Sequence, residues 1–288
     1  MKNILLLSLV LLLSACASPG VVPSDASVQA IKRIRVIAME SRPIRAAGSR
    51  TVVSAAGLDS SKPSSRGPGT VPFPPVPNPT TGSAIGGVFT IIQAGAYLSS
   101  EHPEADQRSQ RISDAAMEIL NRDGPWVPAR VLAVEAERQL TAGGWSTALS
   151  PMLQPIPGYE NRAVKDLDWN WAASINRWYN ADVSEYDYAA HSAAATDTVL
   201  EVLVAVNEVV SISTANLFHL GVMVKLVDPS TRKVFGKVSN GEFIKLSEPE
   251  MDQLFSDGGK AYKELFTTTS RKFVRQCLAR LHLESRRP

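Results

Sequence analysis

The segment from residue 198 to residue 243 constrains the fold most, because its pattern predicts three strands in quick succession. Residues 198–206 are almost all apolar, which favours a strand buried on both faces. Residues 217–227 alternate and place four apolar side chains on one face: Leu220, Val222, Val224 and Leu226. Asp228-Pro229 predicts a tight turn, and residues 234–243 return as the hairpin partner. This part of the chain is therefore expected to form the centre of a β-sheet.

Helical spacing of apolar residues predicts helices around this sheet. Residues 108–121 and 128–142 fit this spacing, and in the second helix Val131, Val134 and Leu140 are expected to face inward. A long helix is expected over residues 250–283, with an early break at Gly258-Gly259. Its apolar face carries Cys277, which favours a buried structural thiol.

The remaining elements complete an α+β prediction, a mixed β-sheet flanked by helices. Residues 31–39 predict a buried first strand, residues 145–153 another strand, and residues 172–179 a helix. A long Pro/Gly/Ser-rich loop over residues 42–81 is expected to be disordered, because such a composition buries too little apolar surface. We therefore expect a single α+β domain over residues 31–288.

The start of the chain has the layout of a secretory signal peptide over residues 1–15. A basic Lys2 precedes an unbroken apolar run over residues 4–13, which ends at small residues before Cys16. The alternatives are an ordinary signal peptide with a chance cysteine, or a transmembrane helix. A membrane-spanning helix needs about 20 apolar residues, which disfavours the second alternative.

The motif Leu13-Ser14-Ala15-Cys16 resembles the lipobox of bacterial lipoproteins. This resemblance implies cleavage before Cys16 and a diacylglycerol on its thiol, with further acyl chains such as palmitate. Two or more chains give stable membrane anchoring. Residue 17 is not aspartate, which in enterobacterial lipoproteins implies the outer membrane. We therefore expect attachment to the periplasmic face of the outer membrane, with residues 16–30 as a flexible lipidated tether.

The order of the predicted elements resembles that of periplasmic lipoproteins similar to the N-terminal domain of TolB and to the curli-secretion lipoprotein CsgG. The segment that carries this resemblance runs over residues 222–234, where a strand enters the sequence LVDPSTRKV. The resemblance implies an α+β periplasmic domain. It brings no catalytic motif, and we carry no secretion function over.

Residues 82–98 form an apolar, uncharged segment that is rich in glycine. Its glycines could permit close contact with a membrane or with another protein, because small residues let backbones approach each other. The alternative is a helix or hairpin buried in the protein's own core. The candidate contact residues are Gly82, Gly86, Gly87 and Gly95.

Aromatic and acidic residues are interleaved over residues 155–195. Four aromatic residues are candidates for stacking on a glycan, or for contact with a lipid headgroup: Trp169, Trp171, Trp178 and Tyr179. Glycosidases use two carboxylates, and this stretch offers two pairs, Asp166 with Asp168 and Glu185 with Asp187, so a glycan-cleaving site is a further alternative. The alternative is that the aromatic residues pack on the sheet while the acidic residues face water.

Other sequence features argue against several functional classes. A formal net charge of +2 gives no electrostatic case for nucleic-acid binding. Lipidation of Cys16 would leave Cys277 as the single thiol, and the four histidines are scattered, so we expect no metal site and no cofactor. No catalytic motif is present. The chain is expected to be a non-catalytic envelope scaffold or assembly accessory that binds an envelope protein or itself.

Overall fold

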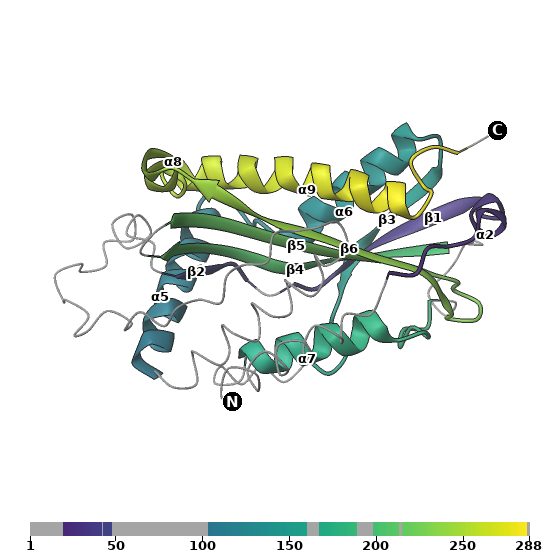
Figure 1. Ribbon diagram of the computed structural model, residues 1–288, viewed down its shortest axis with the longest axis horizontal. Coiled ribbons are helices and arrows are strands. Elements are labelled where there is room, and N and C mark those ends of the chain that lie inside the picture. Colours follow the sequence, from purple (N-terminus) through teal and green to yellow (C-terminus); the bar gives the residue numbers. More distant parts are fainter. Residues whose placement is uncertain are drawn as a thin grey trace, which may run out of the picture.

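A mixed β-sheet forms the framework of the protein. The computed structural model describes residues 20–41, 43–47, 103–159, 167–188, 198–212 and 215–286. Cys16, the glycine-rich segment over residues 82–98, and all of the predicted loop over residues 42–81 except residues 43–47 lie outside this part. Figure 1 shows helices on both sides of the sheet, with α7 on one side and α6 and α9 on the other.

The main path of the sheet runs in the order β3-β1-β4-β5-β6. Strand β1 (Arg33–Met39) lies between β3 (Ser146–Gln154) and β4 (Thr198–Ile212) and is parallel to both. Strands β4, β5 (Ala215–Val227) and β6 (Val234–Leu246) form an antiparallel meander. The predicted mixed sheet, the buried first strand and the hairpin are confirmed.

The helices match the sequence pattern in position. Helices α6 (Pro128–Ala142) and α9 (Lys260–Arg280) pack against each other and against the sheet, while α5 (Pro103–Leu120) packs against β2. Helix α7 (Leu167–Asn180) begins five residues before the predicted start. One inward position was wrong, because Val134 is 49% exposed on the outer side of α6.

The long C-terminal helix is divided, as expected, at its glycine pair. Helix α8 (Glu248–Gln253) and the short helix η2 (Asp257–Gly259) precede α9. Gly258 and Gly259 have φ values of 63° and 71°, a region that disfavours other residues. A Cβ at Gly259 would also lie 2.5 Å from Leu120 Cδ2. The two glycines therefore allow α9 to approach the end of α5.

Two segments that were expected to lack structure are folded where the structure describes them. In the predicted loop, β2 (Arg45–Ala47) pairs with β4, and Ile44 and Ala46 are buried. In the predicted tether, residues 20–30 carry α2 (Asp25–Gln29), and Val28 is buried. Both predictions were wrong at these positions because a few apolar side chains reach the core despite polar surroundings.

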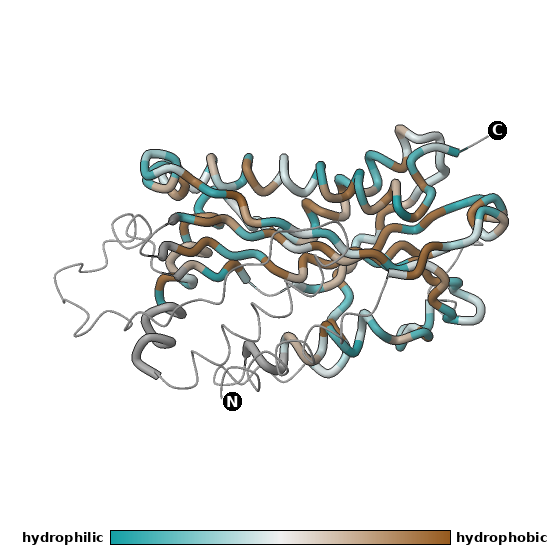
Figure 2. Tube along the Cα trace, in the orientation of Figure 1, coloured by the Kyte–Doolittle hydropathy of each residue, from teal (hydrophilic) through white to brown (hydrophobic). Residues whose placement is uncertain are grey.

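The sheet separates two hydrophobic cores. The larger core contains inward residues of α5, α6 and α9, such as Phe273, together with strand residues such as Leu226. The smaller core lies under α7 and contains Trp171 and Met223. Figure 2 shows apolar residues concentrated along the strands between the helical layers. Strands β4 and β5 are thus covered on both faces, which explains their continuous apolar sequence.

Candidate functional site

The aromatic residues predicted to bind a glycan lie in the smaller core. Trp171, Trp178 and Tyr179 are each at most 3% exposed, so they offer no face on which a sugar could stack. The indole of Trp171 donates a hydrogen bond to the carbonyl oxygen of Ala205 in β4, at 3.1 Å. The glycan prediction was therefore wrong for these three residues. Trp169 belongs to α7, but its side chain lies outside the described part of the structure.

The acidic residues of the same stretch follow the alternative prediction. Asp182, Glu185 and Asp187 are exposed to solvent. Asp166 and the side chain of Asp168 lie outside the described residues. The segment therefore packs its aromatic rings on the sheet and turns these three carboxylates toward water.

A buried ion pair, which the sequence pattern did not predict, lies beneath α7. Glu201 of β4 and Lys225 of β5 are direct cross-strand partners, and their side chains are fully buried. The distance from Lys225 Nζ to Glu201 Oε2 is 3.4 Å. Lys225 also donates to the carbonyl oxygen of Trp178 at 2.9 Å, and its ammonium lies 4.7 Å from the centre of the Trp178 ring.

Three further donors satisfy the Glu201 carboxylate. They are Trp178 Nε1 at 2.9 Å, Ser184 Oγ at 3.0 Å and the hydroxyl of Tyr188 at 2.6 Å. Burial lowers the pKa of Lys225, against the opposing effect of the Glu201 carboxylate. Burial and the nearby Glu201 charge raise the pKa of Tyr188. This network fixes α7 and the following segment to the sheet. Because its members are enclosed, a structural role fits it better than ligand binding.

A second group of contacting polar and aromatic side chains forms a row across four strands, on the same face of the sheet as the Glu201–Lys225 pair. Arg45, Glu208, His219 and Phe243 are consecutive register partners on β2, β4, β5 and β6. Glu208 lies 3.5 Å from Arg45 Nη1 and 3.6 Å from His219 Nδ1. The His219 ring stacks on Phe243 with 3.8 Å between ring centres. Because His219 is buried, a structural role within the sheet also fits this row of side chains.

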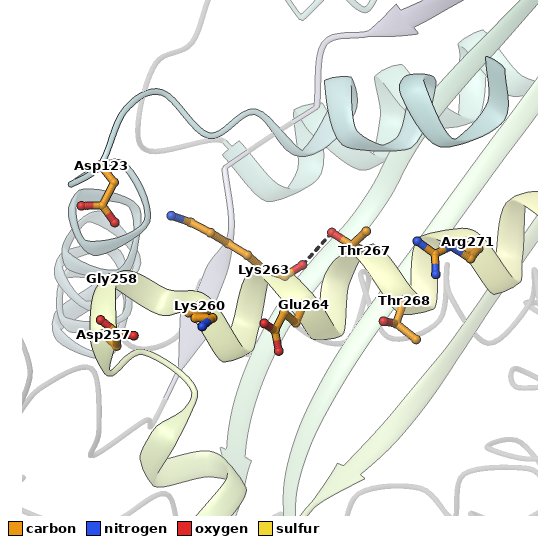
Figure 3. Close-up of a pocket in the computed structure, with 9 residues that line it drawn as sticks. All are labelled: Asp123, Asp257, Gly258, Lys260, Lys263, Glu264, Thr267, Thr268 and Arg271. Atoms are coloured by element: carbon orange, nitrogen blue, oxygen red, sulfur yellow. Dashed lines mark hydrogen bonds between the residues drawn. The ribbon is translucent and has the colours of Figure 1, made fainter. Parts of the chain in front are cut away.

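An open groove of about 600 Å³ follows one side of α9 and reaches the loop after α5. Figure 3 shows its charged side chains, which come mostly from α9, with Asp123 facing them across η2. The acidic members are Asp123, Asp257 and Glu264, and the basic members are Lys260, Lys263 and Arg271. Opposite charges balance, and the residues that line the groove include neither histidine nor cysteine. Such an open surface of balanced charges suits polar contacts.

The two edges of the sheet differ in how they are covered. Val21 pairs with Lys237 of β6, and Val183 pairs with Lys233 just before β6, so two segments occupy the first part of this outer edge. Over residues 238–246, no strand of the described part of the chain pairs with the outer edge. Along β3, no strand within the described residues pairs with the outer edge. Met152 of β3 is 65% exposed, and the carbonyl of Ser150 accepts a hydrogen bond from Arg130. An unpaired strand edge can accept a partner strand.

Cys277 is fully buried, and burial raises the pKa of its thiol to about 12, as expected for a structural thiol. Within the described ranges, no group of histidine, cysteine and acidic side chains could hold a metal ion. No helix among those residues has the length and apolar character needed to cross a membrane.

Comparisons with known proteins give only solved structures with low TM-scores. No family model and no curated protein matches the chain. The PelC dodecamer of Paraburkholderia phytofirmans matches with a TM-score of 0.28 and 16% identity, over 55% of this chain and 77% of that one. The hypothetical protein CT253 of Chlamydia trachomatis gives a TM-score of 0.31 and 14% identity, over 55% and 84%. The lipoprotein GNA1162 of Neisseria meningitidis gives 0.23 and 14%, over 45% and 79%.

Likeness at these scores carries no conclusion about function. The resemblance to TolB and CsgG stays a prediction from the order of elements. The function must therefore be inferred from the chain's own residues.

Proposed function

We propose that this chain is a lipid-anchored, non-catalytic protein of the bacterial envelope that binds a protein partner along the edge of β3. The observation that carries the proposal is the contrast between the sheet edges: two segments of the chain pair along β6 as far as Lys237, and none within the described residues pairs along the outer edge of β3. The anchor is Cys16, in the lipobox-like motif Leu13-Ser14-Ala15-Cys16. The proposed location is the periplasmic face of the outer membrane.

The contact surface on β3 combines backbone and apolar groups. Met152 provides an exposed apolar side chain, and the preceding half of the strand offers the backbone to a partner strand. Pro151 and a shift in the pairing with β1 between Val36 and Ala38 limit this surface to a short stretch. A short edge supports a specific contact while restricting uncontrolled strand addition.

Site-specific photocrosslinking tests the partner contact. A photoreactive amino acid at Met152 should give a discrete adduct in intact envelopes, either with another protein or with a second copy of the chain. The matched control is the same group at Val134, which is also apolar and exposed but lies on the outer side of α6. Adducts at both positions, or at neither, would contradict a partner site on β3.

The anchor is tested by replacing its thiol. Cys16→Ser should abolish lipidation and release the folded protein from the membrane fraction, because the acyl chains supply the membrane affinity. The control is Cys277→Ala, which leaves the lipobox intact and should still fractionate with the outer membrane. Unchanged fractionation of Cys16→Ser would show that the anchor is wrong. The glycine-rich segment remains a second contact candidate and could be tested with Gly86→Leu or Gly95→Leu.

A further inference from the structure

We infer that the covered edge of β6 faces the phospholipid headgroups of the membrane to which Cys16 is attached. The contact surface consists of Val21, Val22 and Val183, with Arg280 beside them, and is called the β6 contact surface below. The inference rests on the proposed lipid anchor. It adds an orientation, since the β6 edge would face the membrane and leave β3, at the opposite edge of the sheet, available to a partner.

The stretch of chain between the anchor and the domain is short. Gly20 is four residues after Cys16, and an extended chain spans at most about 3.6 Å per residue, so the two Cα atoms lie within about 14 Å. Directly after Gly20, the chain contacts the edge of β6. Val21 exchanges two backbone hydrogen bonds of 2.8 Å with Lys237.

Because Gly20 has no side chain, the segment can lie close enough to β6 for Val21 to pair with Lys237. A Cβ at this position would lie 2.9 Å from the carbonyl oxygen of Lys237 and 3.3 Å from Arg280 Nη2. The segment could not then approach β6 as closely. The domain is thus attached near its own sheet edge, rather than through a long free linker.

Exposed apolar side chains lie beside this attachment point. Val21, Val22 and Val183 are 39%, 52% and 51% exposed. Val183 is held to the same edge as Val21, because Ser184 N donates to the Arg232 carbonyl at 2.7 Å and Val234 N donates to the Asp182 carbonyl at 2.8 Å. Three valines that remain exposed next to a lipid anchor fit the interface between headgroups and acyl chains.

The charges around this surface suit a headgroup layer. Arg280 is exposed and donates to the Ser239 carbonyl at 2.7 Å, while Arg232 and Lys233 are exposed next to Val183. Asp182 is also there, with its side chain 90% exposed and 3.4 Å from Lys237 Nζ. Cationic side chains can contact lipid phosphates, and the carboxylate can contact the ammonium group of phosphatidylethanolamine.

Depth-dependent fluorescence quenching of the full-length, lipidated protein tests this orientation. Val22→Cys, Val183→Cys and the control Met152→Cys would each carry an environment-sensitive fluorophore. Cys277 is fully buried, and acylation blocks Cys16, so labelling should be selective. The protein would be reconstituted into vesicles of phosphatidylethanolamine and phosphatidylglycerol, with nitroxide-labelled lipids as quenchers.

The expected result is quenching at positions 22 and 183 that is at least about twofold stronger than at position 152. Equal quenching at the three positions, on vesicle-bound protein whose Cys16 acylation is confirmed by mass spectrometry, would overturn the orientation and leave the anchor intact. Protein that does not float with the vesicles and lacks the acyl mass would instead overturn the anchor, and this inference with it.

A second variant tests the contact between β6 and the segment that begins at Gly20. Gly20→Leu should displace the segment from β6 and reduce quenching at position 183, with acylation unchanged, because the attachment would be lengthened. Unchanged quenching at position 183 in this variant would overturn the role of the seated segment in orienting the domain.

Discussion

The two faces of the sheet are packed by different means. The face under α6 and α9 is sealed by apolar side chains such as Phe273 and Leu278, which give the larger core. The face under α7 contains a smaller apolar core together with the buried Glu201–Lys225 pair and its donors. Directional contacts occur on both faces, such as the hydrogen bond of 2.9 Å from Gln139 of α6 to the Arg271 carbonyl of α9, but the fully buried ion pair lies under α7.

Apolar packing and a buried ion pair contribute differently to stability and to the placement of a helix. Apolar packing is roughly proportional to buried area and tolerates exchange between residues of similar volume. A buried ion pair adds little net stability, because removing two charges from water offsets their attraction, but removing one partner is costly. We therefore expect the charged network to place α7 in a single position, and apolar burial to make the main contribution to holding α6 and α9.

The largest effect is expected for Lys225→Met. This change leaves the Glu201 carboxylate buried without its cation and should lower the free energy of unfolding by about 3–5 kcal/mol. Urea denaturation at neutral pH measures it. The control is Lys272→Met, whose pair with Glu242 is exposed, with side chains 48% and 38% accessible, and for which we expect a loss below about 1 kcal/mol.

A double variant then decides whether the pair acts as a unit. Glu201→Gln combined with Lys225→Met removes both charges, so the double variant should be more stable than Lys225→Met alone. Strictly additive losses would mean that the two residues contribute independently, and the positioning role assigned to the network would be wrong.

An intermediate effect is expected for Trp178→Phe. The ring would still fill most of the space beneath α7, but Glu201 would lose the indole donor at 2.9 Å, at a cost of about 1–3 kcal/mol. The free energy of unfolding and the near-ultraviolet circular dichroism of the remaining tryptophans would record the change. A loss below the experimental error would show that water or another donor replaces the indole.

The strands and helices around this network could largely be predicted from the sequence, because their periodicities are strong. The bounds of α6 match the prediction, and the hairpin between β5 and β6 follows from Asp228-Pro229. The short β2 and α2 could not be predicted. Each depends on very few buried side chains, such as Ala46 and Val28, whose partners lie far away in the chain.

The buried Glu201–Lys225 pair does leave a signal in the sequence. Glu201 is the single charged residue of the predicted strand over residues 198–206, and Lys225 is that of the predicted strand over residues 217–227. Antiparallel pairing of these strands places the two residues opposite each other. The aromatic residues around Trp178 were harder to interpret, because composition does not distinguish rings that cover a sheet from rings that bind a ligand. The β6 contact surface depends on long-range pairing of Val21 and Val183, which no local pattern encodes.

A smaller effect is expected on the opposite face for Leu278→Met. Leu278 is 2% exposed in the larger core, and methionine has a similar volume and an adaptable side chain. We expect a loss below about 1.5 kcal/mol by urea denaturation. A loss as large as that of Lys225→Met would mean that the larger core is as specific as the α7 face, and the contrast between the two faces would fail.

The smallest effect is expected for a charge that belongs to neither face, Asp228 in the turn between β5 and β6. Burial raises the pKa of this carboxyl, but hydrogen bonds from Ser230 and Thr231 outweigh burial and leave the pKa below its ordinary value. Asp228→Asn should therefore cost at most about 0.5 kcal/mol at neutral pH.

The pH dependence of that small loss has a defined sign. A carboxyl whose pKa is lower in the folded state stabilises the protein above its unfolded pKa, about 3.9, and this contribution is lost as the pH falls through the folded value. The difference in unfolding free energy between wild type and Asp228→Asn should stay constant above about pH 5 and shrink below about pH 4. A difference that grew on acidification would mean that the turn does not favour the ionised carboxylate. Asp228 would then resemble the buried Lys225 under α7, where burial opposes ionisation.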